Sequence, residues 1–309
     1  MPAVAFIING TLAGAGHRLG ALCRAAATRA GLKPDFRITR KAEDGTEAAR
    51  RSALSGADLI IAVGGDGTVR CCAEGVADTG VPMGIVPMGT ANLLARTLGI
   101  PSHPHAALRL ALPAEGIARP YTDRRIDLAT ADGIPFTAMA GMGLDAAVVA
   151  ATHLKHQIGW MAYAVSGAAH LAIPPATFTI RLDGGEPFTR VARCVVAGNS
   201  GLLPGGFSLL PAAQLDDGLL DVGVLAPAGP LGWARLATRV LVHSHYEDRQ
   251  LERFRARHVE ITADRPLPRE VDGEVIFAGP SLTMALRSQA LLVRAPCHAR
   301  ARIKVRTEA

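Results

Sequence analysis

The amino-terminal part of the chain alternates short apolar runs with longer segments in which apolar residues recur at helical spacing. The apolar runs predict strands at residues 4–9, 36–39, 59–63 and 83–86, and the segments between and after them predict helices at 19–30, 47–55, 69–77 and 91–98. Alternating strands and helices are typical of an α/β domain with a mostly parallel sheet. Ile100-Pro101 and the histidine-proline stretch that follows predict the end of this pattern.

Beyond residue 119 the pattern becomes rich in strands. Strands are predicted at 125–129, 136–140, 178–182, 191–197, 219–225, 259–262, 274–277 and 282–286, with one helix within 151–173 and another at 231–246. Asp183-Gly184-Gly185 is typical of a hairpin turn. We therefore predict an α/β domain at 1–125 and an antiparallel β domain at 126–290. The strand-like stretch at 290–294 suits either domain, so we expect that the C-terminal segment 291–309 returns to the first domain or stays with the second.

Composition excludes several classes of protein. The chain has 309 residues, of which 49% are hydrophobic, and charge, glycine or proline interrupts every apolar run before it reaches the roughly 18 residues of a transmembrane helix. The first residues lack the basic segment of a signal peptide, which favours the cytoplasm. The net charge of +6 suits anionic lipid or nucleotide, or merely a solvated surface. An aromatic content of 4% argues against nucleic-acid binding.

The cysteines also favour the cytoplasm. Cys23, Cys71, Cys72, Cys194 and Cys297 are odd in number, and no pair has the CxxC spacing of a zinc or redox site. We expect these thiols to be reduced and mostly buried.

One glycine-rich segment carries the main chemical signal. Gly64-Gly65-Asp66-Gly67-Thr68 follows a predicted buried strand and precedes a predicted helix. Glycine lets the backbone turn sharply and bring N–H groups close to an anion, and a helix N-terminus favours negative charge. The segment therefore indicates a phosphate site, with Asp66 positioned for a metal or a reacting hydroxyl. Because such turns also serve purely structural purposes, supporting motifs are needed.

Three further segments supply this support. They are Pro87-Met88-Gly89-Thr90-Ala91-Asn92, residues 214–222 and Val271-Asp272-Gly273-Glu274. In their order and spacing, the four segments resemble the bacterial diacylglycerol kinase-like lipid kinases, which are relatives of the sphingosine and ceramide kinases. The resemblance covers nearly the whole chain. It implies an N-terminal nucleotide-binding domain, a C-terminal β-sandwich domain that binds lipid, and ATP in the cleft between them.

The resemblance also assigns nucleotide contacts, residue by residue. They are Asn9, Thr39, Gly64, Gly65, Asp66, Gly67, Thr68, Val69, Arg70, Gly89, Thr90 and Asn92. Two positions depart from the family pattern. Gly10 replaces a proline that usually follows the asparagine, and Leu93 replaces an aspartate that many bacterial relatives carry. Leucine cannot ligate a metal, so any role of that carboxylate is absent here.

The residues suggest how the reaction proceeds. No Walker-type loop ending in lysine is visible, so we expect backbone N–H groups and Mg²⁺ to hold the triphosphate of ATP while a lipid hydroxyl attacks in line. Asp272 and Glu274 lie two residues apart, and on a strand-like backbone their side chains point alike. We predict that this pair accepts the hydroxyl proton, with Asp66 as a metal-associated group or alternative base. Alanine at Asp272 or Glu274 is expected to abolish turnover and leave folding intact.

The resemblance implies a second, structural Mg²⁺ site at Asp217, with backbone carbonyls near Gln214 and Leu219 as further ligands. Oxygen donors around a tight turn suit a hard cation, although an acidic turn ahead of a strand explains the same residues. The basic and amphipathic segment 153–163 suits lipid entry at a membrane surface, or an ordinary packed helix.

Two alternative functions stay open. An NAD kinase-like enzyme shares the glycine turn, and a non-catalytic nucleotide- or lipid-binding protein could retain the fold without turnover. Under the favoured interpretation, the partners are ATP and a lipid at the membrane surface, with no nucleic acid. The protein would be cytoplasmic and peripherally associated with the membrane. The sequence leaves the identity of the lipid and the oligomeric state open, a homodimer among the alternatives.

Overall fold

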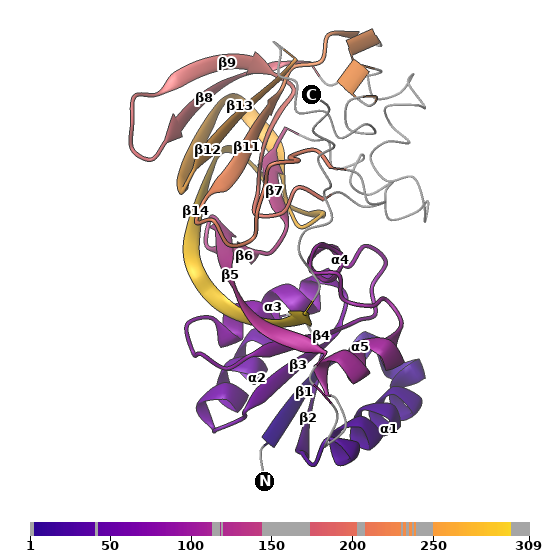
Figure 1. Ribbon diagram of the computed structural model, residues 1–309. Helices are drawn as coiled ribbons and strands as arrows, with labels where there is room; N and C mark the ends of the chain where they lie inside the picture. The colour runs from indigo at the N-terminus through magenta and orange to yellow at the C-terminus, as the bar shows by residue number, and fades with distance from the viewer. Residues whose placement is uncertain are drawn as a thin grey trace, which may run out of the picture. The chain divides into compact units, whose positions relative to one another are not determined.

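The computed structural model describes residues 3–40, 43–112, 118, 120–143, 174–202, 208–229, 231–232, 235–236, 238 and 250–297. The chain divides into two compact units, and Figure 1 labels their elements. The first contains the chain up to Leu128 and again from Gln289 onward, and the second runs from Ala129 to Ser288. The predicted helix within 151–173, with the proposed lipid-entry segment 153–163, lies outside the described residues.

The first unit is built on a parallel sheet in the order β14-β4-β3-β1-β2. Its strands are β1 (Ala3–Asn9), β2 (Lys33–Thr39), β3 (Leu59–Gly64), β4 (Met83–Pro87) and the end of β14 (Glu274–Pro296). Every residue of β3 and of β4 is buried. Strands of a parallel sheet that is covered on both faces read as continuous apolar runs, which is why these two were recognisable in the sequence.

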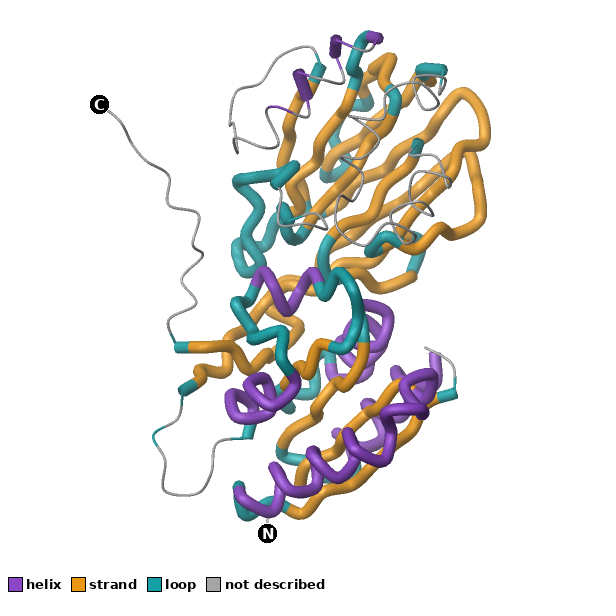
Figure 2. Tube along the Cα trace, turned by 90° about the vertical axis from the view of Figure 1, so that its right-hand side faces the viewer, coloured by secondary structure: helices purple, strands orange, loops and turns teal. Residues whose placement is uncertain are grey.

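Helices surround this sheet, drawn in purple beside the orange strands in Figure 2. They are η1 (Gly10–Leu12), α1 (Ala13–Arg29), α2 (Glu43–Leu54), α3 (Asp66–Val76), α4 (Leu93–Thr97) and α5 (Pro104–Ala111). The prediction that the pattern ends at Ile100-Pro101 is wrong, because α5 follows. Pro104 occupies the first turn of α5, where a missing N–H costs nothing, so this proline starts a helix rather than excluding one.

The second unit is a mostly antiparallel β structure, which confirms the predicted fold class. Its main strand order is β12-β11-β10-β7-β13-β14, and β8 pairs with both β13 and β9. The strands are the end of β5 (Tyr121–Ala131), whose residues up to Leu128 belong to the first unit, and β6 (Ile134–Phe136), β7 (Met139–Met142), β8 (Ala176–Leu182), β9 (Phe188–Ala192), β10 (Cys194–Gly198), β11 (Leu220–Leu225), β12 (Leu251–Ala256) and β13 (His258–Val271). As predicted, β8 and β9 form a hairpin.

Strand β13 pairs with three strands, β14 and, in succession along the chain, β8 and β7. Val259 to Ala263 pair with β8, whereas Arg269 to Val271 pair with β7. The register against β14 shifts between Thr262 and Leu267 and again before Arg269. Such irregularities bend a strand, which lets β13 pair with β8 and then with β7 around a common core. The fully buried Phe136 and Phe178 belong to that core.

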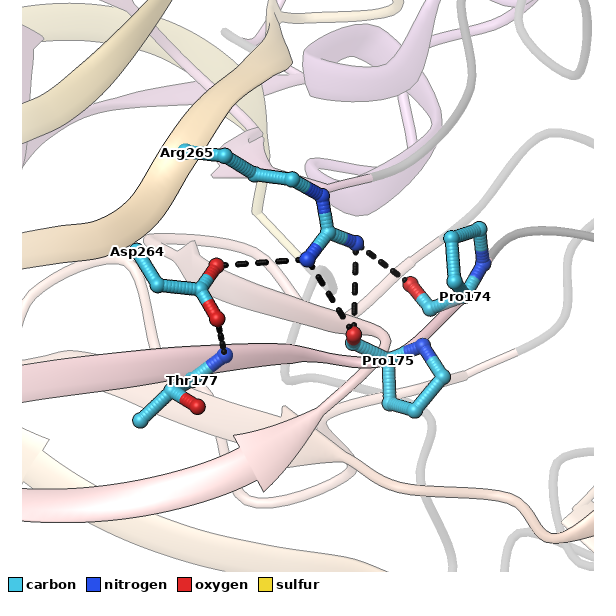
Figure 3. Close-up of polar contacts among 5 residues, drawn as sticks. All are labelled: Pro174, Pro175, Thr177, Asp264 and Arg265. Carbon is cyan, nitrogen blue, oxygen red and sulfur yellow. Dashed lines mark hydrogen bonds and ion pairs between the residues drawn. The ribbon is translucent and has the colours of Figure 1, made fainter.

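The irregular part of β13 also anchors the start of β8 (Figure 3). The guanidinium of Arg265 donates hydrogen bonds to the carbonyl oxygens of Pro174, at 2.8 Å, and Pro175, at 3.2 Å. The neighbouring Asp264 accepts the N–H of Thr177 at 3.0 Å. These contacts fix where the chain re-enters the sheet.

Candidate active site

The two glycine segments of the first unit touch each other at Gly65 and Gly89. A Cβ atom added at Gly89 would lie 2.6 Å from the Cα of Gly65, and one added at Gly65 would lie 3.2 Å from the Cα of Gly89. The N–H of Met88 also donates to the carbonyl oxygen of Gly64 at 2.8 Å. A side chain at Gly89 would push the two backbones apart, and one at Gly65 would be crowded, so backbone groups form the surface where the segments meet.

The turn after β3 leads directly into α3. Gly65 caps this helix in an extended conformation, and the first helical hydrogen bond runs from Val69 N–H to Gly65 O at 3.0 Å. A Cβ at Gly64 would lie 2.3 Å from Oγ1 of Thr68, so the glycine lets this hydroxyl pack on the turn. The N–H groups of the first helical turn have no acceptor inside the helix, and the helix dipole makes this end attractive to an anion.

Asn92 shapes the second glycine segment. It adopts the left-handed conformation, with φ of 48° and ψ of 52°, immediately before α4. Its side chain clamps Gly89 from both sides, because Oδ1 accepts the Gly89 N–H at 2.9 Å and Nδ2 donates to the Gly89 carbonyl at 2.7 Å. Asparagine tolerates this backbone conformation better than most residues, which accounts for the residue type.

The carboxylate of Asp66 joins the two segments. Its Oδ2 accepts the N–H of Asn92 at 2.8 Å, and its Oδ1 accepts the N–H of Leu93 at 2.6 Å. Both donors belong to the start of α4, where backbone N–H groups lack helical partners. The carboxylate therefore fixes α4 against the glycine turn. The predicted roles of Asp66 at a metal or as an alternative base stay predictions.

Asn9 reaches the same site from the end of β1. Its Nδ2 donates to Oγ1 of Thr68 at 3.2 Å, and its Oδ1 accepts both the N–H and the hydroxyl of Thr11. The departure at Gly10 has a steric reason, since a Cβ there would lie 2.3 Å from the carbonyl oxygen of Thr39. Thr39 ends the neighbouring strand, and its hydroxyl donates to the carbonyl of Ile8 at 3.4 Å.

The structure thus brings together most of the predicted nucleotide contacts. The contacts above link Asn9, Gly64, Gly65, Asp66, Thr68, Gly89 and Asn92. Thr90 is exposed between Gly89 and Asn92. Val69 and Arg70 are buried in α3, and their predicted contacts with a nucleotide stay predictions. Leu93 is also buried, which places an aliphatic side chain where relatives carry a carboxylate.

In the second unit, Asp272 is held by the turn between β6 and β7. Its Oδ2 accepts the N–H of Thr137 at 2.9 Å and the Thr137 hydroxyl at 3.3 Å. Its Oδ1 accepts the N–H groups of Ala138, at 2.8 Å, and Met139, at 3.1 Å. Asp272 is buried and left-handed, with φ of 48°. These contacts give the carboxylate a clear positioning role and run against the expectation that alanine here leaves folding intact.

A neighbouring carboxyl group was not recognised in the sequence. Glu270 is buried in β13, two residues before Asp272, and Glu274 is exposed two residues after it. Burial raises the pKa of Glu270 to about 7, with a further contribution from the charge of Asp272 and an opposing one from the Gly273 N–H. The expectation that Asp272 and Glu274 point alike on a strand-like backbone is wrong. Asp272 and Gly273, with φ of 48° and 82°, form the tight turn between β13 and β14. Across this turn Val271 pairs with Glu274 and Glu270 with Val275, so the two-residue spacing does not place the acidic side chains on one side.

The acidic turn before β11 contains Asp217 and leads to Asp221. Asp217 accepts the N–H of Leu219 at 3.1 Å and forms an ion pair with Arg255. Burial raises the pKa of Asp221 to about 6, although Arg255 lowers it. Among the described residues, no group of three or more His, Cys, Asp or Glu side chains is arranged to hold a metal ion. Roles of Gln214, Asp217 and Leu219 as Mg²⁺ ligands stay predictions.

Comparison with known protein families matches both halves of the chain. Residues 3–121 match the diacylglycerol kinase catalytic domain, and residues 138–294 match the YegS C-terminal NAD kinase beta sandwich-like domain. The chain belongs to the diacylglycerol kinase-like lipid kinases. It is therefore a kinase whose acceptor is an alcohol group, and the NAD kinase alternative is not favoured.

Individual relatives in this family cover most of the chain. A probable lipid kinase YegS-like protein of Pseudomonas fluorescens is 34% identical over 86% of this chain and 87% of its own length. A diacylglycerol kinase of Bacillus subtilis is 32% identical over 80% of each chain. The fold is shared with a diacylglycerol kinase from Bacillus anthracis of known structure, with a TM-score of 0.70 and 23% identity over 96% of this chain and 97% of that one.

The remaining observations concern membranes and thiols. Within the part of the chain that the structure describes, no helix combines the length and apolar character needed to span a bilayer. Four of the five cysteines are buried and Cys297 is exposed, which confirms the prediction that the thiols are mostly buried.

Proposed function

We propose that this protein transfers the γ-phosphoryl group of ATP to the hydroxyl of diacylglycerol or a related lipid, with Mg²⁺ accompanying the nucleotide. The hydroxyl oxygen forms a bond to the γ-phosphorus, the bond from that phosphorus to the β,γ-bridging oxygen breaks, and ADP leaves. The observation that carries the proposal is the pair of touching glycine segments in a chain whose two halves both match this kinase family.

Support for nucleotide binding comes from the first unit. Backbone N–H groups at the start of α3 and around Gly89 suit the oxygens of a polyphosphate, and no side chain intervenes where the segments meet. In phosphoryl transfer, catalysis depends on positioning and charge neutralisation more than on covalent chemistry. A rigid pair of backbone loops, with a cation on the nucleotide, suits that requirement.

We further propose distinct roles for the two carboxylates of the Asp-Gly-Glu turn. Both oxygens of Asp272 are already engaged by four hydrogen-bond donors of the turn between β6 and β7. Glu274 is exposed, so its carboxylate is accessible to a substrate hydroxyl. Glu274 is therefore the proton acceptor, and Asp272 is a positioning residue that sets the turn.

The acceptor class implies where the enzyme works. A lipid alcohol is presented at a membrane surface, so we propose a cytoplasmic enzyme that meets its substrate at the bilayer without spanning it. The net charge of +6 is in keeping with attraction to anionic lipid.

A substrate panel tests the proposal. Purified protein is incubated with γ-labelled ATP and, separately, diacylglycerol, phosphatidylglycerol, a sphingoid base, ceramide or NAD in mixed micelles with Mg²⁺. Label in a lipid that depends on Mg²⁺ supports the proposal. Label in NAD alone, or no transfer to any acceptor by a protein that binds ATP, refutes it.

A further inference from the structure

The acidic turn of the second unit already contains a positive charge. Arg255 on β12 lies directly opposite Asp221 on β11 in the antiparallel register. Its Nη2 donates to Oδ2 of Asp217, and its Nε lies 3.5 Å from Oδ2 of Asp221. A single guanidinium therefore bridges both carboxylates. Its several N–H groups form a rigid fork, a geometry that suits two acceptors at once.

Burial makes this bridge important for Asp221 in particular. The side chain of Asp221 is 3% exposed, whereas those of Asp217 and Arg255 are 19% and 42% exposed. Oδ2 of Asp221 is buried and accepts no hydrogen bond from the described residues, so its compensation comes from the ion pair with Arg255, with a smaller contribution from the charge of Arg253. A buried carboxylate that loses its counter-charge is strongly destabilising, whereas the more solvated contact with Asp217 contributes less.

The same geometry is poorly suited to Mg²⁺ while Arg255 is present. Mg²⁺ requires near-octahedral oxygen ligands at about 2.0–2.1 Å and usually keeps several waters. Both oxygens of Asp217 already accept hydrogen bonds, one from the Leu219 N–H and one from Arg255. An ion that binds Asp217 would therefore have to displace, or be repelled by, a guanidinium in direct contact with the same carboxylate.

We propose that Arg255 is the resident cation of this acidic turn, and that it takes the charge-neutralising role that the family resemblance assigns to a structural Mg²⁺. In this protein the turn is held without metal. A divalent cation binds there only when the guanidinium is removed, and Asp217 and Asp221 then supply the ligands. The proposal concerns the fold of the second unit and does not depend on the proposed kinase activity.

The experiment measures metal binding and thermal unfolding of the full-length protein without nucleotide or lipid. Wild type, Arg255→Met and Arg181→Met are compared in EDTA and in millimolar Mg²⁺ or Mn²⁺. Arg181 is the matched control, because it pairs with the single exposed carboxylate of Glu260 at 3.9 Å. We expect Arg255→Met to unfold roughly 5 °C or more below wild type in EDTA and to recover at least half of this loss with metal. Wild type and Arg181→Met should show no metal-dependent shift.

Further variants keep the test decisive. Adding Asp217→Asn to Arg255→Met should remove the metal response, which places the gained cation at this turn. If Arg255→Met does not fold, Arg255→Lys preserves a charge and should remain folded and insensitive to EDTA. Stabilisation of wild type by Mg²⁺ that Asp217→Asn abolishes would overturn the proposal. So would an Arg255→Met protein that is as stable as wild type, or one that gains no metal response.

Discussion

Oδ1 of Asp66 accepts the backbone N–H of Leu93 at 2.6 Å, and this contact connects the turn after β3 to the start of α4. Oδ2 of the same carboxylate accepts the N–H of Asn92. Asp66, the acidic residue of the glycine turn, therefore has a structural role in addition to any chemical one. A loss of activity on replacing Asp66 cannot by itself identify a base or metal ligand, so its variants need a structural measurement beside the kinetic one.

We first predict that Asp66→Ala destabilises the protein by about 2–4 kcal/mol, because two charge-assisted hydrogen bonds are lost. Asp66→Asn keeps one acceptor oxygen and should lose about half as much. Urea unfolding measures both, and KM for ATP should rise in the same order as the loss of stability. The matched control is Asp58→Asn, whose carboxylate accepts the Ala3 N–H at 2.7 Å on an exposed surface. Asp66→Asn with wild-type stability but no turnover would favour a chemical role.

The contact between the glycine segments makes a second prediction. Gly89→Ala would bring a Cβ to 2.6 Å from Gly65, so the segments must separate and ATP binding should weaken at least about 10-fold. Isothermal titration with a non-hydrolysable ATP analogue measures this. Gly20→Ala is the control, because a Cβ there meets nothing within 4 Å. Unchanged affinity in Gly89→Ala would remove the claim that this close approach shapes the nucleotide site.

Our third prediction is that substitutions of Asp272 and Glu274 have different effects. Asp272→Ala strips the acceptor from the buried N–H groups of Thr137, Ala138 and Met139, and should destabilise the protein by about 3–5 kcal/mol. Glu274→Gln should retain wild-type stability and lose roughly 100-fold or more in kcat, because only the proton acceptor has changed. Chemical unfolding and steady-state kinetics measure the two effects. A Glu274→Gln enzyme with normal turnover contradicts the assignment of the base.

A fourth prediction concerns pH. The pKa of Glu270 is raised from 4.5 to about 7 in the folded protein, so folding favours its protonated form. Its contribution to stability is fully present below the unfolded pKa and is lost as pH rises through about 7, with a total change on the order of 3 kcal/mol. Glu270→Gln mimics the protonated group and should reduce this dependence. Unfolding free energies compared at about pH 5 and pH 8 test this prediction, and an equal pH slope in variant and wild type would contradict it.

Much of the first unit could be predicted from the sequence, because its strands and its glycine turn are each specified by a few consecutive residues. The buried strands at β3 and β4 are continuous apolar runs, and the glycine turn has a recognisable spacing. Helix boundaries were less accurate. Helix α4 was expected from Ala91 but starts at Leu93, because the left-handed Asn92 interrupts it. That conformation depends on the side-chain clamp to Gly89, which residue spacing does not reveal.

The second unit was harder to predict because its decisive features are long-range. The stretches 274–277, 282–286 and 290–294 are one strand, β14, despite Gly279 and Pro280 within it. Strand β12 was not expected, since Arg253 and Arg255 interrupt its apolar pattern, and Arg255 has its partners in a turn far away in sequence. Glu270 likewise looks like any strand glutamate until the structure shows that it is buried.

The end of β14 has a consequence for biosynthesis. Val293, with no exposed surface, pairs with Met83 in the sheet of the first unit, and Arg294 donates to the carbonyl of Ala111 at the end of α5. The sheet of the first unit therefore lacks this strand until the segment around Val293 has been translated, long after residues up to Leu128. A fragment ending near Leu128 would expose the flank of β4, and a peptide spanning residues 289–297 supplied separately should restore it.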